Sequence, residues 1–183
     1  MRGWGGKPIT TMTDEFRTPG WLVDACLDQL GPYIEPQDVL LDPAAGNGVW
    51  GNKMRLMFLD CQVNECEITL GSDFYDVTYE YDWIIGNPPF SKLTQWLSHT
   101  GSIAGKGFGY LLPVHALSAN RLDMLAEWGF YLDKMHIIVN PLEWQLGYPH
   151  AFCIFTRKGQ MHVLGGLVTD TKQTRLTDLC GND

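Results

Sequence analysis

Hydrophobic and polar positions along this chain alternate between a strand-like and a helix-like periodicity. Short apolar runs rich in β-branched and aromatic residues predict strands, and apolar positions at helical spacing predict helices. The predicted strands cover residues 39–41, 61–68, 81–85, 107–112, 134–139 and 151–155, and the predicted helices cover residues 19–30, 49–56, 92–100 and 120–128. Such alternation is typical of an open α/β fold with a mostly parallel sheet and helices on both faces. The last two strands lie close together in the sequence, which predicts an antiparallel hairpin at the end of the sheet.

Length and composition favour one folded domain between two tails. The chain has 183 residues, 45% of them hydrophobic, which is enough for one sizeable core. Residues 1–13 are rich in Gly and Thr, and we expect a flexible arm there. We expect the folded domain at residues 14–158 and a polar tail at residues 159–183.

The sequence shows no membrane or export signal. It contains no apolar run of 18 residues, and its first residues, MRGWGGKP, lack the apolar stretch of a signal peptide. We therefore expect an intracellular, cytoplasmic protein that does not enter a membrane. The five cysteines include no CxxC pair, so we expect them to be reduced and structural, and we expect no metal site.

The formal net charge of -8 limits how this chain can bind a polyanion. Proteins that hold long duplexes usually carry a basic face, which releases counterions from the phosphates. The Lys and Arg residues of this chain are scattered through an acidic sequence. Any contact with a nucleic acid must therefore depend on a few local cations.

Two loops that follow predicted strands carry the candidate chemistry. DPAAGNG occupies residues 42–48, and GNPPF occupies residues 86–90. Because ligands bind beyond the carboxyl ends of the strands in an open α/β sheet, both loops are expected at one crevice. Gly46 and Gly48 allow a sharp turn that brings backbone amides near a ligand. No Gly-Lys-Ser or Gly-Lys-Thr follows and Asp42 would repel a phosphate, so a ligand with a positive amine suits this loop better.

The second loop suggests transfer of a group to a planar amine. Its two consecutive prolines, Pro88 and Pro89, cannot continue a central strand and make the loop rigid. The Asn87 side-chain oxygen and the Pro88 carbonyl can accept hydrogen bonds from an aromatic amine and so turn its lone pair toward an electrophile. Phe90 offers a face on which a planar substrate can stack. The alternative is a structural loop with Phe90 folded into the core.

With these motifs the chain resembles the S-adenosylmethionine-dependent amino-methyltransferases, above all the adenine-N6 DNA methyltransferases. DPAAGNG is similar to the cofactor loop of this family, NPPF to its catalytic loop, and DEFRTPGWLVDACL (residues 14–27) to its upstream Thr-Pro segment. The compact form looks like the versions found in phages and mobile elements. The resemblance implies a Rossmann-like class I methyltransferase sheet and S-adenosyl-L-methionine as cofactor.

The resemblance also implies which residues hold the cofactor. Asp42 and Gly46 would hold its methionine part, and an acidic residue after the second strand, Glu65 or preferably Glu67, would hold the ribose hydroxyls. Asp73 would accept a hydrogen bond from the adenine amine. The implied cofactor set is Thr18, Pro19, Asp42, Pro43, Ala44, Gly46, Gly48, Glu67, Asp73, Phe74 and Asn87, and the implied catalytic set is Asn87, Pro88, Pro89 and Phe90.

The chain departs from the family's pattern in two places. Only residues 69–72 separate the second strand from Asp73, where family members usually have a helix. We expect no separate target-recognition domain after the last strand, so sequence selectivity would come from the arm, from the loops at residues 101–107 and 141–149, from a protein partner, or hardly at all.

Four further residues are candidates for contact with the substrate, namely Lys92, His115, Trp144 and Tyr148. A base inside a duplex has to be flipped out, or supplied as a single strand, to reach such a crevice. Trp144 and Tyr148 either stack on neighbouring bases, as in single-strand binders, or cover the core as loop aromatics. His115 either lines the substrate pocket or has a structural role.

The motifs together predict transfer of a methyl group to the N6 amine of adenine in DNA. Two alternatives remain open at this point. The same chemistry can act on adenine in ribosomal or transfer RNA, which suits an acidic domain delivered by a partner. A non-catalytic methyltransferase-fold subunit of a heteromeric complex is the second alternative.

Overall fold

The apolar runs assemble into one sheet in the computed structural model, which describes residues 17–141, 144, 148–159 and 162–167. The strands are β1 Val39–Asp42, β2 Gln62–Glu65, β3 Tyr81–Gly86, β4 Ala104–Pro113, β5 Tyr131–Ile138, β6 His150–Thr156 and β7 His162–Leu167. The helices are α1 Gly20–Leu30, α2 Val49–Met57, α3 Leu93–Ile103 and α4 Ala119–Glu127. None of the helices in the described part of the chain is long and apolar enough to cross a membrane.

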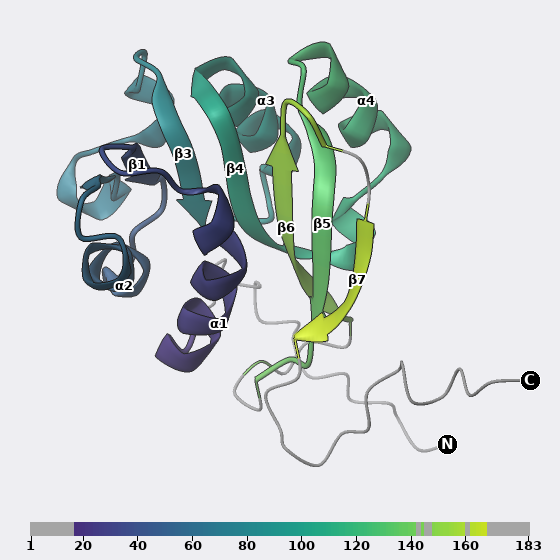
Figure 1. Ribbon diagram of the computed structural model, residues 1–183. Helices are drawn as coiled ribbons and strands as arrows, with labels where there is room; N and C mark the ends of the chain where they lie inside the picture. Colours follow the sequence, from purple (N-terminus) through teal and green to yellow (C-terminus); the bar gives the residue numbers. More distant parts are fainter. Residues whose placement is uncertain (1–16, 142–143, 145–147, 160–161, 168–183) are drawn as a thin grey trace, which may run out of the picture.

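The strands lie in the order β2-β1-β3-β4-β6-β5-β7, most of which can be followed from left to right in Figure 1. The pairs β1–β2, β1–β3, β3–β4 and β5–β7 are parallel, whereas β6 runs antiparallel to both β4 and β5. Residues 139–149, which join β5 to β6, are too few for a parallel crossover. The predicted mostly parallel sheet with an antiparallel terminal hairpin is therefore confirmed.

Helices cover both faces of the sheet, and each face has its own apolar cluster. Residues of α1 and α2 pack with alternate strand residues such as Leu40 and Ile85 on one face. Residues of α3 and α4 pack with Leu41 and Ile84, the neighbours of those residues, on the other. Figure 1 shows α1 in front of the sheet and α3 and α4 on the opposite side. The period of two along each strand thus fills two cores at once.

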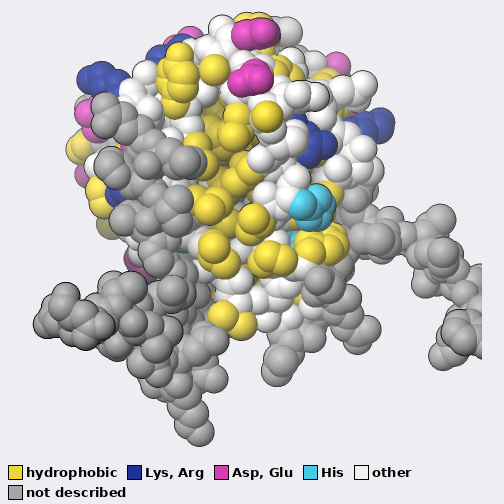
Figure 2. Space-filling model, turned by 90° about the vertical axis from the view of Figure 1, so that its right-hand side faces the viewer, with side chains coloured by type: hydrophobic (Ala, Val, Ile, Leu, Met, Phe, Trp, Pro, Cys, Tyr) yellow, Lys and Arg dark blue, Asp and Glu magenta, His cyan; other side chains and the backbone are white. Residues whose placement is uncertain are grey.

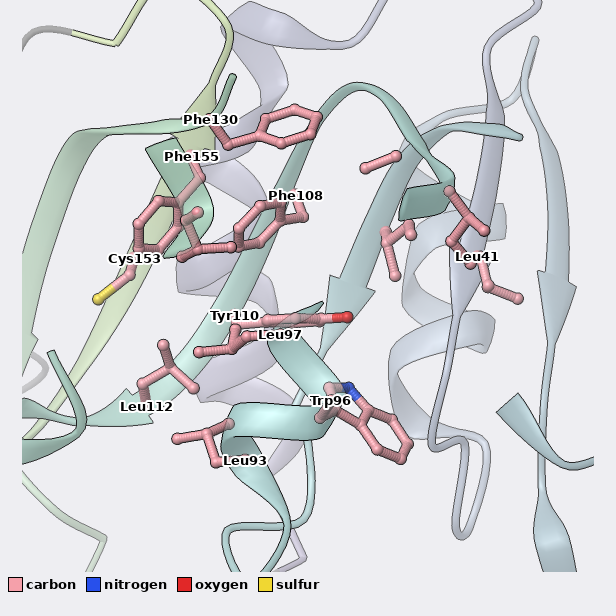
Figure 3. Close-up of a cluster of buried hydrophobic side chains, with 14 of the residues drawn as sticks. Leu41, Leu93, Trp96, Leu97, Phe108, Tyr110, Leu112, Phe130, Cys153 and Phe155 are labelled. Atoms are coloured by element: carbon pink, nitrogen blue, oxygen red, sulfur yellow. The ribbon is translucent and has the colours of Figure 1, made fainter. Parts of the chain in front are cut away.

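The cluster beneath α3 and α4 is rich in aromatic side chains (Figure 3). The rings of Phe108 in β4 and Phe155 in β6 are stacked, with centroids 4.6 Å apart. Tyr110 lies next to them in β4, and its hydroxyl contacts the Thr100 hydroxyl of α3 at 2.8 Å. These buried contacts fasten the antiparallel β6 to the parallel half of the sheet.

The segment after β1 and α2 differs from the sequence prediction. A strand was expected at residues 61–68, but β2 ends at Glu65 and Ile68–Leu70 form a single 3-10 turn. The side chain of Glu67 accepts a hydrogen bond from the Thr69 amide and so begins this turn. A second 3-10 turn follows at Phe74–Asp76. Side chains that bond to their own backbone compete here with strand pairing.

Two other segments have more regular structure than the sequence predicted. Residues 162–167, assigned to the polar tail, form β7 beside β5. Residues 101–107, treated as a loop that could contact the target, are the end of α3 and the start of β4. They lie at the amino ends of the parallel strands and so face away from the two candidate loops.

Candidate active site

A cavity of about 630 Å³ opens beyond the ends of β1, β2 and β3. Both candidate loops contribute to it, as do the chain before α1 and residues 67–75. The lining residues are Arg17, Thr18, Pro43, Ala44, Ala45, Gly46, Asn47, Val49, Trp50, Glu67, Ile68, Thr69, Ser72, Asp73, Phe74, Tyr75, Asn87, Pro89, Ser91, Lys92 and Trp96. The structure thus brings DPAAGNG and NPPF to one cavity.

The candidate residues from the sequence divide into two groups by position. Those on the cavity wall are Thr18, Pro43, Ala44, Gly46, Glu67, Asp73, Phe74, Asn87, Pro89 and Lys92. Those that are not among the lining residues are Pro19, Asp42, Gly48, Pro88, Phe90, His115, Trp144 and Tyr148.

The loop between β1 and α2 is fastened to the chain that follows β2. Gly46 and Gly48 have φ angles of 53° and 75°, a left-handed conformation that glycine adopts without strain. The Gly46 amide donates to Glu67 Oε2 at 2.7 Å, and the Ala45 amide donates to the Cys66 carbonyl at 2.9 Å. One wall of the cavity is therefore fixed by hydrogen bonds between two loops.

The two acidic candidates after β2 have different surroundings. Glu65 lies outside the lining, and its Oε2 accepts from Arg55 at 2.6 Å. Glu67 lines the cavity, and its Oε1 accepts from the hydroxyl and the amide of Thr69 at 2.6 and 3.0 Å. These bonds, the hydroxyl first, keep the pKa of Glu67 below its usual range. Of the two acids, only Glu67 therefore presents its carboxylate on the cavity wall.

Asp42, the last residue of β1, lies behind the wall. Its side chain is fully buried, and its Oδ1 accepts from the Ala44 amide at 3.3 Å. Burial first, and then the charges of Glu65 and Glu67, raise the pKa of Asp42 to about 7, although the amides of Ala44 and Gly51 act in the opposite direction. A cation bound nearby would favour the ionised form of this carboxyl group.

Aromatic rings line one end of the cavity. Asp73 Oδ1 accepts from the Tyr75 amide at 3.0 Å and so begins the turn that carries Phe74 and Tyr75. The buried ring of Phe74 lies 4.4 Å from Trp96, centroid to centroid, and Tyr75 meets Trp96 edge to face at 5.7 Å. A flat heterocycle can pack against such a wall while its amine reaches the Asp73 carboxylate.

The catalytic-loop candidate Asn87 is tied to the Thr-Pro segment. Its Nδ2 donates to Thr18 Oγ1 at 3.4 Å, and the same hydroxyl oxygen accepts from Trp50 Nε1 at 3.2 Å. Thr18 is 6% exposed, so this junction is shielded from water. Thr18 thereby links the loop after β3 to α2. Pro88, which follows Asn87, is buried.

Phe90 lies beside a buried histidine that the sequence analysis missed. The ring centroids of Phe90 and His150 are 5.7 Å apart. Asn140 donates through Nδ2 to the Tyr148 carbonyl at 2.8 Å, and its Oδ1 lies 2.9 Å from His150 Nδ1. Burial, aided by the charge of His115, lowers the pKa of His150 to about 4, so the ring is neutral and we assign its proton to Nδ1.

The remaining aromatic candidates lie further from the cavity. Trp144 is buried, donates to the Arg17 carbonyl at 3.0 Å and meets His150 edge to face at 5.1 Å. This environment matches the alternative in which Trp144 covers the core. Tyr148 is half-buried, and exposed His115 meets it edge to face at 4.8 Å. These two rings reach the surface on the Phe90 side.

Comparisons with known proteins are consistent with this geometry. No protein-family model matches the chain, and no curated protein matches its sequence. Its structure is similar to a methyltransferase subunit of a type I restriction-modification system from Streptococcus thermophilus, with a TM-score of 0.64 and 15% identity over 82% of this chain and 47% of that one. It is also similar to magnesium protoporphyrin IX methyltransferase from Synechocystis PCC 6803 with bound SAM, with a TM-score of 0.60 and 13% identity over 75% of this chain and 79% of that one.

A third similar structure is the precorrin-6y C5,15-methyltransferase of Geobacter metallireducens, with a TM-score of 0.56 and 10% identity over 81% of this chain and 93% of that one. The chain spans about half the length of the restriction-modification subunit and most of the length of the other two. All three share the arrangement of sheet and helices. The fold is that of the Rossmann-like S-adenosylmethionine-dependent methyltransferases.

Proposed function

We propose that this chain transfers a methyl group from S-adenosyl-L-methionine to the exocyclic N6 amine of adenine in DNA. The observation that supports this most directly is the position of Asn87. It follows β3 in the sequence NPPF and lies on the wall of the cavity that Gly46, Glu67 and Asp73 also line. A cofactor site and an amine-orienting loop therefore meet at one place.

The chemistry of the cavity fits this cofactor. Glu67 is suited to the ribose hydroxyls, and Asp73 to the amine of the adenine ring. The rings of Phe74 and Trp96 offer a wall for that adenine. Asp42, behind the glycine loop, can supply a negative charge opposite a cationic ligand. Bound S-adenosylmethionine supplies an electrophilic methyl group on a positive sulfur.

The loop after β3 orients the target amine. The side-chain oxygen of Asn87 and the carbonyl of Pro88 accept the two amine hydrogens, so the lone pair turns toward the methyl donor. Pro88 and Pro89 keep these acceptors in place, because their φ angles are fixed. Phe90, packed near His150, stacks on the base. The amine proton becomes acidic as the new bond forms, so the step needs no strong base.

The proposal is tested by transfer of labelled methyl from S-adenosylmethionine to duplex DNA, single-stranded DNA, RNA and protein extract. We expect label in DNA, and we expect Asn87→Ala to lower kcat by about 100-fold, as loss of one oriented polar group does at other active sites. Asn120→Ala serves as the matched control, because this exposed asparagine lies outside the cavity.

Calorimetric titration of each variant with S-adenosylmethionine separates catalysis from cofactor binding. Label that appears in RNA and not in DNA would support the proposed methyl transfer but show that RNA, and not DNA, is the substrate. A native chain that binds the cofactor and labels nothing would favour a subunit that needs a partner.

A further inference from the structure

A second hollow adjoins the candidate active site. It has a volume of about 360 Å³ and is lined by Ser91, Lys92, Leu93, Thr94, Gln95 and Arg121. Ser91 and Lys92 line both this hollow and the main cavity, so the two open next to each other directly after the NPPF loop. We call it the α3–α4 groove, because its walls are the chain at the start of α3 and Arg121 of α4.

Arg121 is held in the groove by neutral groups. Its Nε donates to Thr94 Oγ1 at 3.0 Å, and its NH1 donates to the Ala116 carbonyl at 3.0 Å. No carboxylate of the described residues lies within ion-pair distance of Arg121 or Lys92. The guanidinium is therefore fixed in place while its charge remains uncompensated.

Three other cations of the described residues, Lys53, Arg55 and Lys106, have carboxylate partners. Lys53 contacts Asp24 at 2.7 Å, and Arg55 contacts Glu65 at 2.6 Å. Lys106, at the amino end of the sheet, contacts three carboxylates. On the side shown in Figure 2, Lys and Arg side chains form separate spots around a hydrophobic band and no continuous basic face. What distinguishes Lys92 and Arg121 is that both line one groove beside the main cavity and that neither forms an ion pair with a described residue.

We propose that the α3–α4 groove binds a backbone phosphate of the nucleic-acid strand that carries the target base. A phosphodiester is the ligand expected where an arginine, a lysine and the Ser91 and Thr94 hydroxyls line one groove and the lining residues include no carboxylate. The proposal rests on the proposed function, because the base of that strand is expected at Asn87, on the wall that Lys92 shares. The groove would let a protein of net negative charge bind a polyanion through a few local contacts.

The groove is tested by direct binding of fluorescently labelled DNA and RNA oligonucleotides, measured by anisotropy over a range of salt concentrations. We expect Arg121→Gln to raise the Kd for the oligonucleotide about tenfold and to lower the slope of log K against log salt by about one, which is the loss of one phosphate contact. Lys92→Gln, which alters an exposed side chain, should act in the same direction.

Lys158→Gln is the matched control. It removes one positive charge from an exposed lysine after β6, at the opposite edge of the sheet. It should change the oligonucleotide Kd less than twofold. Arg121→Gln should leave the Kd for S-adenosylmethionine unchanged, because Arg121 lies outside the main cavity.

The outcomes separate the groove from the proposed function. If the Arg121 and Lys92 variants bind oligonucleotides as the Lys158 variant does, or if the native chain binds none, the groove proposal is wrong even where methyl transfer succeeds. If binding depends on Arg121 and Lys92 but no methyl is transferred to any nucleic acid, the groove stands and the proposed function fails. A preference of the groove for DNA or RNA identifies the source of the phosphate.

Discussion

Two buried aspartates lie at the two ends of β1 and have different partners. Asp38 lies where the parallel strands begin, the amino edge of the sheet, and Asp42 lies where they end, the carboxyl edge. Asp38, just before β1, is 3% exposed and accepts from the Lys106 ammonium at 2.6 Å and from the Glu35 amide at 3.0 Å. Asp42, at the other end of the same strand, is fully buried, and no Lys or Arg of the described residues forms an ion pair with it. The first charge is neutralised within the fold, and under the proposed function the second faces the cationic cofactor.

The same contrast extends to the neighbours of each aspartate. At the amino edge, Lys106 contacts Glu35 and Asp38, both at 2.6 Å, which raises the pKa of its ammonium group. At the carboxyl edge, Glu67 accepts hydrogen bonds from backbone amides and a hydroxyl. Charge at the amino edge is paired within the fold, whereas under the proposed function charge at the carboxyl edge is held in place for the cofactor. Substitutions at the amino edge should therefore lower stability without changing cofactor affinity, whereas substitutions at the carboxyl edge should weaken cofactor binding.

The largest effect is expected from Asp42→Asn. The native state holds the Asp42 proton up to about pH 7, whereas the unfolded chain loses it near pH 4. Between these values the native state binds more protons, so the contribution of Asp42 to the free energy of unfolding falls as pH rises and is flat above pH 7. Asp42→Asn should remove this loss of stability, which is on the order of 4 kcal/mol over the whole window from about pH 4 to about pH 7. Urea unfolding at pH 5 and pH 8 measures it.

The same variant should bind S-adenosylmethionine more weakly than the native chain at pH 8, because the cation loses its buried counter-charge. Asp38→Asn is the control, since Asp38 lies at the far edge of the sheet and its loss should alter stability without altering cofactor affinity. A pH dependence of unfolding that is the same in native protein and in Asp42→Asn would contradict this account of the aspartate.

The next effect in size concerns Glu67→Ala. Removing the carboxylate deletes the proposed acceptor for the ribose hydroxyls and frees the Gly46 amide. We expect the Kd for S-adenosylmethionine to rise about 30-fold, or ~2 kcal/mol, as for a hydrogen bond to a charged group. Calorimetric titration measures this change. Glu35→Ala removes a carboxylate from the amino edge and should leave the Kd as it is. Equal affinities in the two variants would overturn the assignment of Glu67.

The smallest effect is expected from Lys106→Gln. This change leaves the buried Asp38 carboxylate without its cation but keeps the hydrogen bond from the Glu35 amide. Because Lys106 is itself partly exposed, we expect a loss of only about 1 kcal/mol in the free energy of unfolding. Cofactor affinity and methyl transfer should stay at native levels. A variant that kept its stability but lost activity would reverse the comparison between the two edges.

The parts of the site that follow from local sequence could be predicted. Parallel strands end at one edge, so the order of strand and loop was enough to bring residues 42–48 and 86–90 to one cavity. The family resemblance limited the acid expected near the ribose to Glu65 or Glu67, with Glu67 preferred. The structure adds a contact between Glu65 and Arg55 of α2, for which the sequence carries no signal.

Other parts depend on contacts between residues that are distant in the chain. The hydrogen bond between Thr18 and Asn87 joins residues 69 positions apart. His150 starts an apolar strand, so nothing in its neighbourhood indicates that its ring meets Phe90. Trp96 lies on the apolar face of its helix, where a core position and a cavity wall look alike. Short turns replaced the expected end of the second strand, because the side chains of Glu67 and Asp73 bond to nearby amides.

The most direct test of the central claim is the identity of the methylated product. Unmethylated DNA is incubated with the native chain and S-adenosylmethionine carrying a labelled methyl group, then digested to nucleosides and analysed by mass spectrometry. We expect label in N6-methyl-2′-deoxyadenosine, and about 100-fold slower labelling when Asn87→Ala replaces the native chain. Label in a methylated cytosine carbon, or in the same adenine product regardless of Asn87, would contradict the proposed site.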